Sequence, residues 1–290
     1  MPKILDGRVV QAKIKQQLLD ECCGLKIPPY LVIIQVGERA ESTLYIERKK
    51  VFADLIGVRI THAHYPETIS QADLISAIQS FNQDKSVHGI IVQIPLPAYL
   101  STPAILDTIK AEKDVDGLSA TNIQSAWHNK PGLRPATARG VMTLLEHYQI
   151  PVAGRLVTVV GRSALVGKPI ALTCLNAGAT VTVCHRQTPN LSAVTKQADI
   201  LISAAGSPNL ITSNHVHKDQ VVIDVGINVI TGEKLIEEVG SRKLVGDVDF
   251  TAVAPIVEAI SPVPGGVGPL TIACLFENLL EAYIKQSRIR

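Results

Sequence analysis

Short apolar runs alternate with amphipathic stretches along the whole chain. The first half combines predicted strands near 31–36, 58–65 and 89–94 with predicted helices near 9–22, 41–56 and 71–82. The helices are predicted from apolar residues three and four positions apart, and the strands from short apolar runs between turn residues. This alternation is typical of parallel strands joined by crossover helices, so the first half is predicted to form one α/β unit.

The second half predicts another α/β unit. Its predicted strands, at 156–160, 179–184, 199–204 and 221–225, are almost continuously apolar, as expected of strands covered on both faces. A segment rich in proline and glycine, 130–135, precedes a predicted helix over 137–148, so we expect the boundary near residue 140. A last amphipathic helix over 270–285 is expected to pack back onto the first unit.

The predicted fold class is therefore α/β, with two domains and a cleft between them. One domain is expected over 1–140, with residues 270–290 packing onto it, and the other over 141–269. A length of 290 residues suits two domains of roughly 100 to 200 residues each. With 46% hydrophobic and 19% charged residues, the composition is that of a globular protein that buries a large core.

Charge and terminal sequence narrow the expected partners and location. The formal net charge is +2, from 28 basic and 26 acidic residues, and no basic run appears, so nucleic acid is not an expected partner. The N-terminus lacks the pattern of a secretion signal, and no run approaches the ~18 apolar residues of a membrane span. We therefore expect a cytoplasmic protein without a membrane partner.

The five cysteines and the paired histidines do not have the spacing of a metal site. The cysteines are interpreted as packing residues in a reducing compartment. Two pairs, His62 with His64 and His215 with His217, have no third ligand nearby in the sequence, and surface histidines explain them better. No metal is predicted.

A turn that suits a dinucleotide follows the predicted strand at 156–160. It runs from Gly161 through Arg162 and Ser163 to Val166 and Gly167, and an apolar helix comes next. Glycine permits a tight turn, and the N–H groups at the start of the helix favour a pyrophosphate. Ser163 replaces the usual second glycine and the third glycine comes one residue late, so the context of strand and helix carries the interpretation. The alternative is a plain strand-to-helix turn.

The end of the next predicted strand indicates which dinucleotide binds. Folds of the Rossmann type usually have an acidic residue there when the ligand is NAD, and an arginine when it is NADP. This strand ends in Cys184, His185 and Arg186, without an acid. Arg186 and Arg162 therefore favour NADP, since a guanidinium chelates phosphate, although either arginine alone is also explained as a solvated charge.

A lysine interrupts an apolar face of the predicted helix at 41–56. Helical spacing puts Tyr45, Lys49, Phe52 and Ile56 on one stripe. Removal of the Lys49 amine from water lowers its pKa, which makes a lysine useful as a base near neutral pH. The alternative is a lysine that extends along the rim of this face to reach solvent.

Three further features suit a ligand site. Gln93 is a polar residue near the carboxyl end of a predicted strand, the end at which α/β sheets bind ligands. Asp116 provides a carboxylate at an Asp-Gly turn, a feature that is also common in purely structural turns. The loop 262–269 contains three prolines and three glycines, which suits a rigid backbone close to a ligand.

Together these motifs resemble the bifunctional methylenetetrahydrofolate dehydrogenase/methenyltetrahydrofolate cyclohydrolase family. The resemblance covers nearly the whole chain and rests on five motifs in the family's order, at residues 45–49, 92–97, 113–117, 161–169 and 262–269. It implies oxidation of 5,10-methylenetetrahydrofolate by NADP, then hydrolysis to 10-formyltetrahydrofolate, within one-carbon metabolism. It also implies a homodimer that acts on tetrahydrofolate derivatives, and it makes 1–140 the folate-binding catalytic domain and 141–269 the Rossmann-type NADP domain.

The resemblance also implies roles for individual residues. Lys49 would assist water attack on the methenyl carbon, Gln93 would hydrogen-bond Lys49, Asp116 would bind the pterin, and Tyr45 would stack along the folate. The other substrate-binding residues implied are Ser42, Val92, Pro264, Gly265 and Gly268. The cofactor-binding residues implied are Gly161, Arg162, Ser163, Val166, Gly167, His185, Arg186 and Ile227.

Several positions depart from the family pattern. Ala136 and Ala138 stand in a segment that is commonly Pro-Cys-Thr-Pro, and Gln124 stands where a glycine is common. Leu270 replaces a frequent methionine, which conserves volume. Two alternatives remain open: a dehydrogenase that has lost hydrolysis, and a non-catalytic NADP-binding sensor. Retention of Lys49, Gln93 and Asp116 favours two activities.

Overall fold

The computed structural model describes residues 2–231 and 242–288. The chain forms two compact units. The first consists of the residues up to Gln11 together with Thr137–Thr271, and the second of Ala12–Ala136 together with the chain from Ile272 onward. The chain therefore passes between the units inside its first helix, near Thr137 and inside its last helix.

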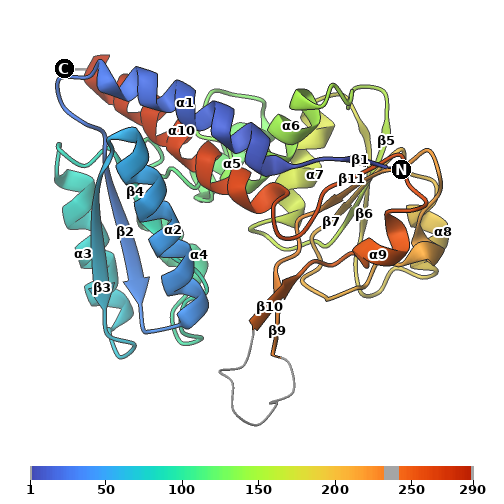
Figure 1. Cartoon of the computed structure of the whole chain (residues 1–290). Coiled ribbons are helices and arrows are strands. Elements are labelled where there is room, and N and C mark those ends of the chain that lie inside the picture. The colour runs from blue at the N-terminus through green and yellow to red at the C-terminus, as the bar shows by residue number, and fades with distance from the viewer. Residues whose placement is uncertain (1, 232–241, 289–290) are drawn as a thin grey trace, which may run out of the picture. The chain divides into compact units, whose positions relative to one another are not determined.

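The second unit is built on a parallel sheet of three strands in the order β3-β2-β4. These are β2 (Tyr30–Val36), β3 (Arg59–Tyr65) and β4 (Gly89–Val92), and every residue of β2 is buried. Helices α2 (Ala40–Ile56) and α3 (Gln71–Gln83) lie beside the strands (Figure 1). Two shorter helices follow, α4 (Thr102–Thr108) and α5 (Ala120–Trp127).

The last helix, α10 (Val267–Arg288), belongs to this unit from Ile272 onward. Phe276 stacks on Phe52 of α2 with ring centroids 5.1 Å apart, and Asn278 donates to the carbonyls of Val115 and Arg134. Gly89 is required where β4 meets this helix, because a Cβ there would lie 2.6 Å from a methyl carbon of Leu279. This part of α10 is therefore a core element of the second unit.

The hydropathy of α10 corrects one expectation. The stretch Val267–Ser287 has a mean hydropathy of 1.3 and is long enough to cross a membrane, so the expectation that no run approaches that length is wrong. However, 61% of the stretch is buried inside the protein. A core helix passes the same test of length and composition.

The first unit contains a parallel sheet of six strands in the order β1-β11-β8-β7-β5-β6. The strands are β1 (Lys3–Ile4), β5 (Leu156–Val160), β6 (Thr180–Cys184), β7 (Ile200–Ser203), β8 (Val221–Asp224) and β11 (Ala259–Ile260). Its helical elements are α6 (Ala136–His147), α7 (Gly167–Asn176), α8 (Leu191–Thr195), η1 (Ser213–His215) and α9 (Phe250–Val253). A separate antiparallel pair consists of β9 (Asn228–Thr231) and β10 (Arg242–Val245).

Two expectations about this unit need correction. The domain expected over 1–140 does not include the N-terminus, because β1 pairs with β11 and the following helix, α1 (Gly7–Cys23), begins against the loop before α10 through Gly7 N and Gly265 O. A two-residue strand is too short to produce a hydrophobic period. The strand β6 is not covered on both faces: it is the edge strand, and Val183 is 39% exposed.

Candidate active site

Lys49 is the central side chain of the candidate site in the second unit. It lies on the buried face of α2 with Phe52 and Ile56, and only 7% of it is exposed. Its Nζ donates to Oε1 of Gln93 at 2.9 Å. The amine is therefore held inside the unit, and the alternative of a lysine that extends to solvent is excluded.

Gln93 is fixed by the strand that precedes it. Its backbone N–H donates to the carbonyl of Ile34, which extends the pairing of β4 with β2 by one residue. Its side-chain Nε2 donates to the carbonyl of Ile94 at 3.0 Å. With the amide nitrogen engaged in this way, the amide oxygen faces Lys49 as an acceptor.

Asp116 lies in the segment 113–117, in which the neighbouring side chains of Lys113 and Asp114 are hydrogen-bonded to other parts of the same unit. Lys113 is buried and its Nζ donates to three carbonyls at the C-terminal end of α3. Asp114 is 1% exposed and accepts from Gly117 N, Ser119 N and the Asn122 amide. Gly117 turns the chain at φ 71°. Asp116 is partly exposed, and its charge acts on Lys49.

Lys49 and Asp116 influence each other's protonation. Burial lowers the pKa of Lys49, and the Asp116 carboxylate opposes this shift. Burial raises the pKa of Asp116, and the Lys49 ammonium opposes it, while Asp114 adds to it. In both groups burial is the largest cause, so a neutral amine is easier to reach at Lys49 than at a solvated lysine.

The remaining predicted residues of this unit lie on the same two elements, helix α2 and strand β4. Tyr45 lies one helical turn before Lys49, is partly buried, and has the Arg48 guanidinium 5.8 Å from its ring centroid. Burial raises the pKa of the Tyr45 hydroxyl. Ser42 and Val92 are both buried, at 6% and 2% exposure. The second unit therefore brings together Tyr45, Lys49, Gln93 and Asp116 through helix α2, the end of β4 and one turn.

The dinucleotide turn lies in the first unit at the carboxyl end of β5. Gly161 has φ 121°, and a Cβ there would lie 2.1 Å from the carbonyl oxygen of Ala204. A Cβ on Gly167 would lie 2.1 Å from the carbonyl oxygen of Gly161. Ser163 Oγ accepts from Val166 N and Gly167 N at 3.2 Å each, so a hydroxyl occupies the position in front of α7 that favours anions.

The other cofactor residues predicted from the sequence lie near this turn or the neighbouring strand ends. Arg162 and Arg186 are exposed, and neither forms an ion pair with the residues that the structure describes. His185 begins the turn after β6, where its Nδ1 accepts from Gln187 N. Ile227, which follows β8, is 43% exposed and lies next to Gly268.

The proline- and glycine-rich loop connects β11 with α10 in the first unit. Gly265 has φ 113° and its carbonyl accepts from Gly7 N at 2.8 Å. Pro264 precedes it in the loop, and Gly268 lies in the first turn of α10. The predicted substrate residues are thus divided: Pro264, Gly265 and Gly268 belong to the unit of the dinucleotide turn, and the others belong to the unit of Lys49.

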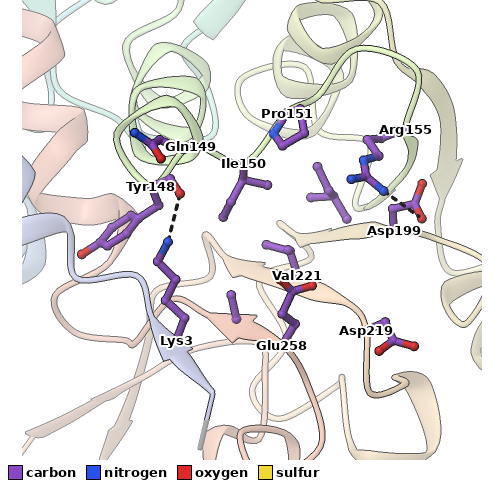
Figure 2. Close-up of a pocket in the computed structure, with 12 residues that line it drawn as sticks. Lys3, Tyr148, Gln149, Ile150, Pro151, Arg155, Asp199, Asp219, Val221 and Glu258 are labelled. Atoms are coloured by element: carbon purple, nitrogen blue, oxygen red, sulfur yellow. Dashed lines mark hydrogen bonds and ion pairs between the residues drawn. The ribbon is translucent and has the colours of Figure 1, made fainter.

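A cavity of about 170 Å³ lies in the first unit at the amino ends of the strands (Figure 2), whereas the dinucleotide turn lies at their carboxyl ends. It is lined by residues at the amino ends of β7, β8 and β11, and Lys3 donates across it to the carbonyl of Tyr148 at 3.0 Å. Arg155 and Asp199 face each other at 3.9 Å on its other side. No predicted site residue lines this cavity, so it is separate from the dinucleotide edge.

Metal and thiol chemistry are not indicated by the described part of the chain. Over 2–231 and 242–288, no group of three histidine, cysteine, aspartate or glutamate side chains is arranged to hold a metal ion. Four of the five cysteines are buried, which suits their interpretation as packing residues, but Cys23 at the end of α1 is exposed. Sequence analysis assigned no role to Asp224 and Asp247, which are buried at the dinucleotide edge.

Two family models match the chain. The catalytic domain of tetrahydrofolate dehydrogenase/cyclohydrolase matches residues 5–116, and the NAD(P)-binding domain of the same family matches residues 135–287. The bifunctional protein FolD 2 of Lactobacillus johnsonii is 42% identical over 289 residues, which cover 99% of each chain.

Solved structures agree with these matches. The bifunctional enzyme FolD of Campylobacter jejuni, a methylenetetrahydrofolate dehydrogenase/cyclohydrolase, is 41% identical, with a TM-score of 0.92 over 98% of this chain and 99% of that one. The FolD of Trypanosoma brucei, solved with NADP cofactor and an inhibitor, is 33% identical, with a TM-score of 0.93 over 99% of this chain and 100% of that one. The likeness therefore extends over the two units and their sheets.

Proposed function

The chain belongs to the tetrahydrofolate dehydrogenase/cyclohydrolase family, and we infer from this that it catalyses two successive reactions on one-carbon derivatives of tetrahydrofolate. It oxidises 5,10-methylenetetrahydrofolate to 5,10-methenyltetrahydrofolate with NADP, and it hydrolyses that product to 10-formyltetrahydrofolate. It is therefore an NADP-dependent methylenetetrahydrofolate dehydrogenase and a methenyltetrahydrofolate cyclohydrolase. The observation that carries the hydrolysis is the buried contact of Lys49 with Gln93 beside Asp116. The oxidation rests on the dinucleotide turn that begins at Gly161.

Hydrolysis is assigned to Lys49. In its neutral form the amine takes a proton from water while the water oxygen bonds to the methenyl carbon. The resulting ammonium returns that proton to folate N5 as the bond between N5 and the carbon breaks, and the hydroxyl proton leaves to solvent as the formyl carbonyl forms. Burial, which lowers the pKa of Lys49, increases the share of neutral amine available for the first step.

Gln93 positions Lys49 for this chemistry. Its oxygen accepts one N–H of Lys49, which orients the amine without supplying a negative charge that would stabilise the ammonium. Asp116 is proposed to accept hydrogen bonds from the pterin, and Tyr45 to stack along it. Ser42, Val92, Pro264, Gly265 and Gly268 complete the proposed set of substrate-binding residues.

The dinucleotide turn fits NADP on the evidence of its own residues. Gly161 and Gly167 have no room for a side chain, and Ser163 holds two N–H groups at the amino end of α7. Two exposed arginines, which form no ion pair with the residues that the structure describes, lie at the same edge. Arg162 and Arg186 are proposed to bind the 2′-phosphate. Val166, His185 and Ile227 complete the proposed cofactor residues. NADP, when bound, accepts the hydride, and the protein's part is to hold the two ligands in register.

We further propose that the protein is a cytoplasmic homodimer that acts without a nucleic acid or membrane partner. The near-neutral net charge of +2 supports the first exclusion, and the burial of most of α10 supports the second. Sedimentation of the purified protein tests the dimer. A mass that remains that of one chain at assay concentration would contradict it.

The proposed function is tested by a mixture of protein, methylenetetrahydrofolate and either NADP or NAD. We expect absorbance of reduced nicotinamide with NADP and much less with NAD, and the methenyl product is expected to disappear by hydrolysis. Reduction without hydrolysis would indicate a dehydrogenase that has lost the second activity. NADP binding without either reaction would indicate a non-catalytic sensor.

A further inference from the structure

Two carboxylates are buried side by side at the carboxyl edge of the six-stranded sheet. Asp224, the last residue of β8, is 3% exposed, and Asp247 is 0% exposed. The backbone N–H of Asp247 donates to Oδ1 of Asp224 at 3.0 Å. The proposed reactions use neither side chain. Burial of a carboxylate costs free energy unless hydrogen-bond donors surround it. The groups that donate to the two carboxylates therefore show which segments of the chain the pair holds in place.

Asp247 holds the loop that follows β7. Its Oδ2 accepts from Ala205 N at 2.6 Å and from Gly206 N at 3.1 Å, and its Oδ1 accepts from Ser207 N at 2.9 Å. Successive backbone N–H groups that converge on one anion form a nest. Ser203 Oγ adds a further bond at 3.2 Å. One side chain thus binds four of the five residues from Ser203 to Ser207, all but Ala204.

Ala204 is the residue that connects this loop to the dinucleotide turn. Its carbonyl oxygen lies where a Cβ on Gly161 would be 2.1 Å away, and the backbone nitrogen of Ala205 would be 3.1 Å from the same Cβ. The peptide between Ala204 and Ala205 therefore packs directly on Gly161. A shift of the loop that Asp247 holds would move the first residue of the phosphate-binding turn.

Asp224 holds the segment that follows β8. Its Oδ1 accepts from Gly226 N at 2.9 Å, and Asn228 donates to Asp247 Oδ1 at 3.0 Å. Ile227, a proposed cofactor residue, lies between these two anchored residues and is 43% exposed. The pair therefore constrains the residues on both sides of Ile227.

Two glycines leave room for the carboxylates. A Cβ on Gly226 would lie 2.2 Å from Cγ of Asp247, and a Cβ on Gly246 would lie 1.8 Å from Oδ2 of Asp224. Both clashes are with carboxylate groups that several hydrogen bonds hold in place, so the groups cannot move aside cheaply. The segments around the two acids are thus shaped to bring backbone N–H groups against them.

We propose that Asp224 and Asp247 are positioning residues of the cofactor site, which hold the loops after β7 and β8 in the conformation that binds the dinucleotide. The proposal rests on the proposed NADP-dependent function. It assigns the pair no contact with the reacting atoms. Its effect is on cofactor affinity and on the KM for NADP, and the hydrolysis of added methenyltetrahydrofolate, assigned to Lys49 in the other unit, is expected to remain.

The positioning should depend on pH. Burial, and to a smaller extent the charge of Asp247, raises the pKa of Asp224 to about 7, while its bonds from backbone N–H groups oppose the shift. Within the described residues, Asp247 is the charged group that acts on Asp224. Ser203 of β7, which pairs with Asp224, and Ser261, which follows β11, are neutral. The ionised carboxylate accepts from Gly226, Asp247 and Val248 N–H groups, and protonation turns one oxygen into a donor that conflicts with them.

The test compares NADP binding by the wild type and by Asp224→Asn between about pH 6 and about pH 8.5. The amide resembles the protonated acid, so we expect about tenfold weaker binding by the variant at the upper pH and nearly equal binding at the lower pH. The ratio of the two Kd values cancels any titration of NADP itself. Asp249→Asn is the matched control, because Asp249 caps α9 through Ala252 N and asparagine caps helices equally well.

A second variant keeps the proposal testable if Asp224→Asn does not fold. Ser203→Ala removes one donor to Asp247 and should weaken NADP binding about threefold, with unchanged hydrolysis of methenyltetrahydrofolate. A wild type that binds no NADP would overturn the proposed function itself. A wild type that binds NADP, with variants that bind it equally well at every pH, would overturn only the positioning role.

Discussion

The amide oxygen of Gln93 lies 2.9 Å from the amine nitrogen of Lys49, and this contact joins the end of β4 to the buried face of α2. The nature of the partner matters as much as the distance. A carboxylate at the position of Gln93 would stabilise the ammonium and raise the pKa of Lys49, whereas a neutral amide orients the amine with little effect on its charge. Burial can then lower the pKa of Lys49, with Asp116 as the opposing charge.

Lys49→Met tests the assignment of hydrolysis. Methionine fills a similar volume on the apolar face but cannot transfer a proton, so hydrolysis of methenyltetrahydrofolate should fall by at least about 100-fold. NADP binding should be unchanged, because the proposed cofactor residues belong to the other unit. Lys50→Met is the control: Lys50 is partly exposed and pairs with Glu47 at 2.7 Å, so its loss should change the rate less than about twofold. Hydrolysis at the wild-type rate in Lys49→Met would contradict the mechanism.

Asp114→Asn and Asp116→Asn should separate stability from substrate binding. Asp114 is buried and accepts three hydrogen bonds, so an amide nitrogen in its place faces other donors and should lower the free energy of unfolding by about 1–3 kcal/mol. Asp116→Asn should leave stability almost unchanged and raise the KM for both folates. Urea unfolding can be followed by the fluorescence of Trp127, the single tryptophan, which lies in the same unit. Equal destabilisation by the two variants would refute the division of roles.

The main strands and helices were predictable because each has a strong period. The predicted strand at 156–160 matches β5, and α2, α3 and α6 begin and end within one or two residues of the predicted bounds. The strands β1 and β11 were missed because two residues cannot show a period, and β1 alone moves the N-terminus into the other unit. The helices α4 and α5 were missed because they are short and only partly buried.

The candidate site was predictable where a polar residue interrupts an apolar pattern. Lys49 lies on an apolar helix face and Gln93 at the end of an apolar strand, and both features are visible in the sequence alone. The contact between them was expected only from the family resemblance, because sequence spacing does not reveal which helix face meets which strand end. Asp224 and Asp247 could not be assigned a role from the sequence, since their burial and their donors depend on two loops that meet only in the fold.

Replacement of Arg162 and Arg186 by alanine tests the preference for NADP. Both arginines are exposed and lie at the end of the sheet where the turn is proposed to bind phosphate. Their loss should raise the KM for NADP by about 10- to 100-fold and leave the KM for NAD within about threefold, because only NADP carries the 2′-phosphate. Arg155→Ala, which alters an arginine at the opposite edge of the same sheet, is the control. Equal losses with both dinucleotides would mean that the arginines bind the shared pyrophosphate.

The raised pKa of Asp224 also predicts how the stability of the first unit depends on pH. The pKa is about 7 in the folded protein and near 3.8 in the unfolded chain, so between these values the folded state keeps a proton that the unfolded state releases. This contribution to stability is fully present below about pH 4 and is lost as the pH rises through about 7, with a slope of at most about 1.4 kcal/mol per pH unit. The ionised form of Asp224 accepts best from the N–H donors, but burial raises the free energy of that same form. Such local strain is common at functional sites.

Asp224→Asn should remove this slope. Hydrogen exchange of peptides from β7 and β8, followed by mass spectrometry, reports opening of this unit directly, whereas Trp127 reports the other. We expect protection in the wild type, corrected for the intrinsic exchange rate, to fall between about pH 5 and about pH 8 relative to Asp224→Asn. Asp6, whose pKa is lowered by its bond with Arg8, contributes in the opposite direction and only near or below its ordinary value of 3.8, so it does not obscure the comparison. Parallel protection curves for the wild type and Asp224→Asn would show that Asp224 does not titrate in this interval.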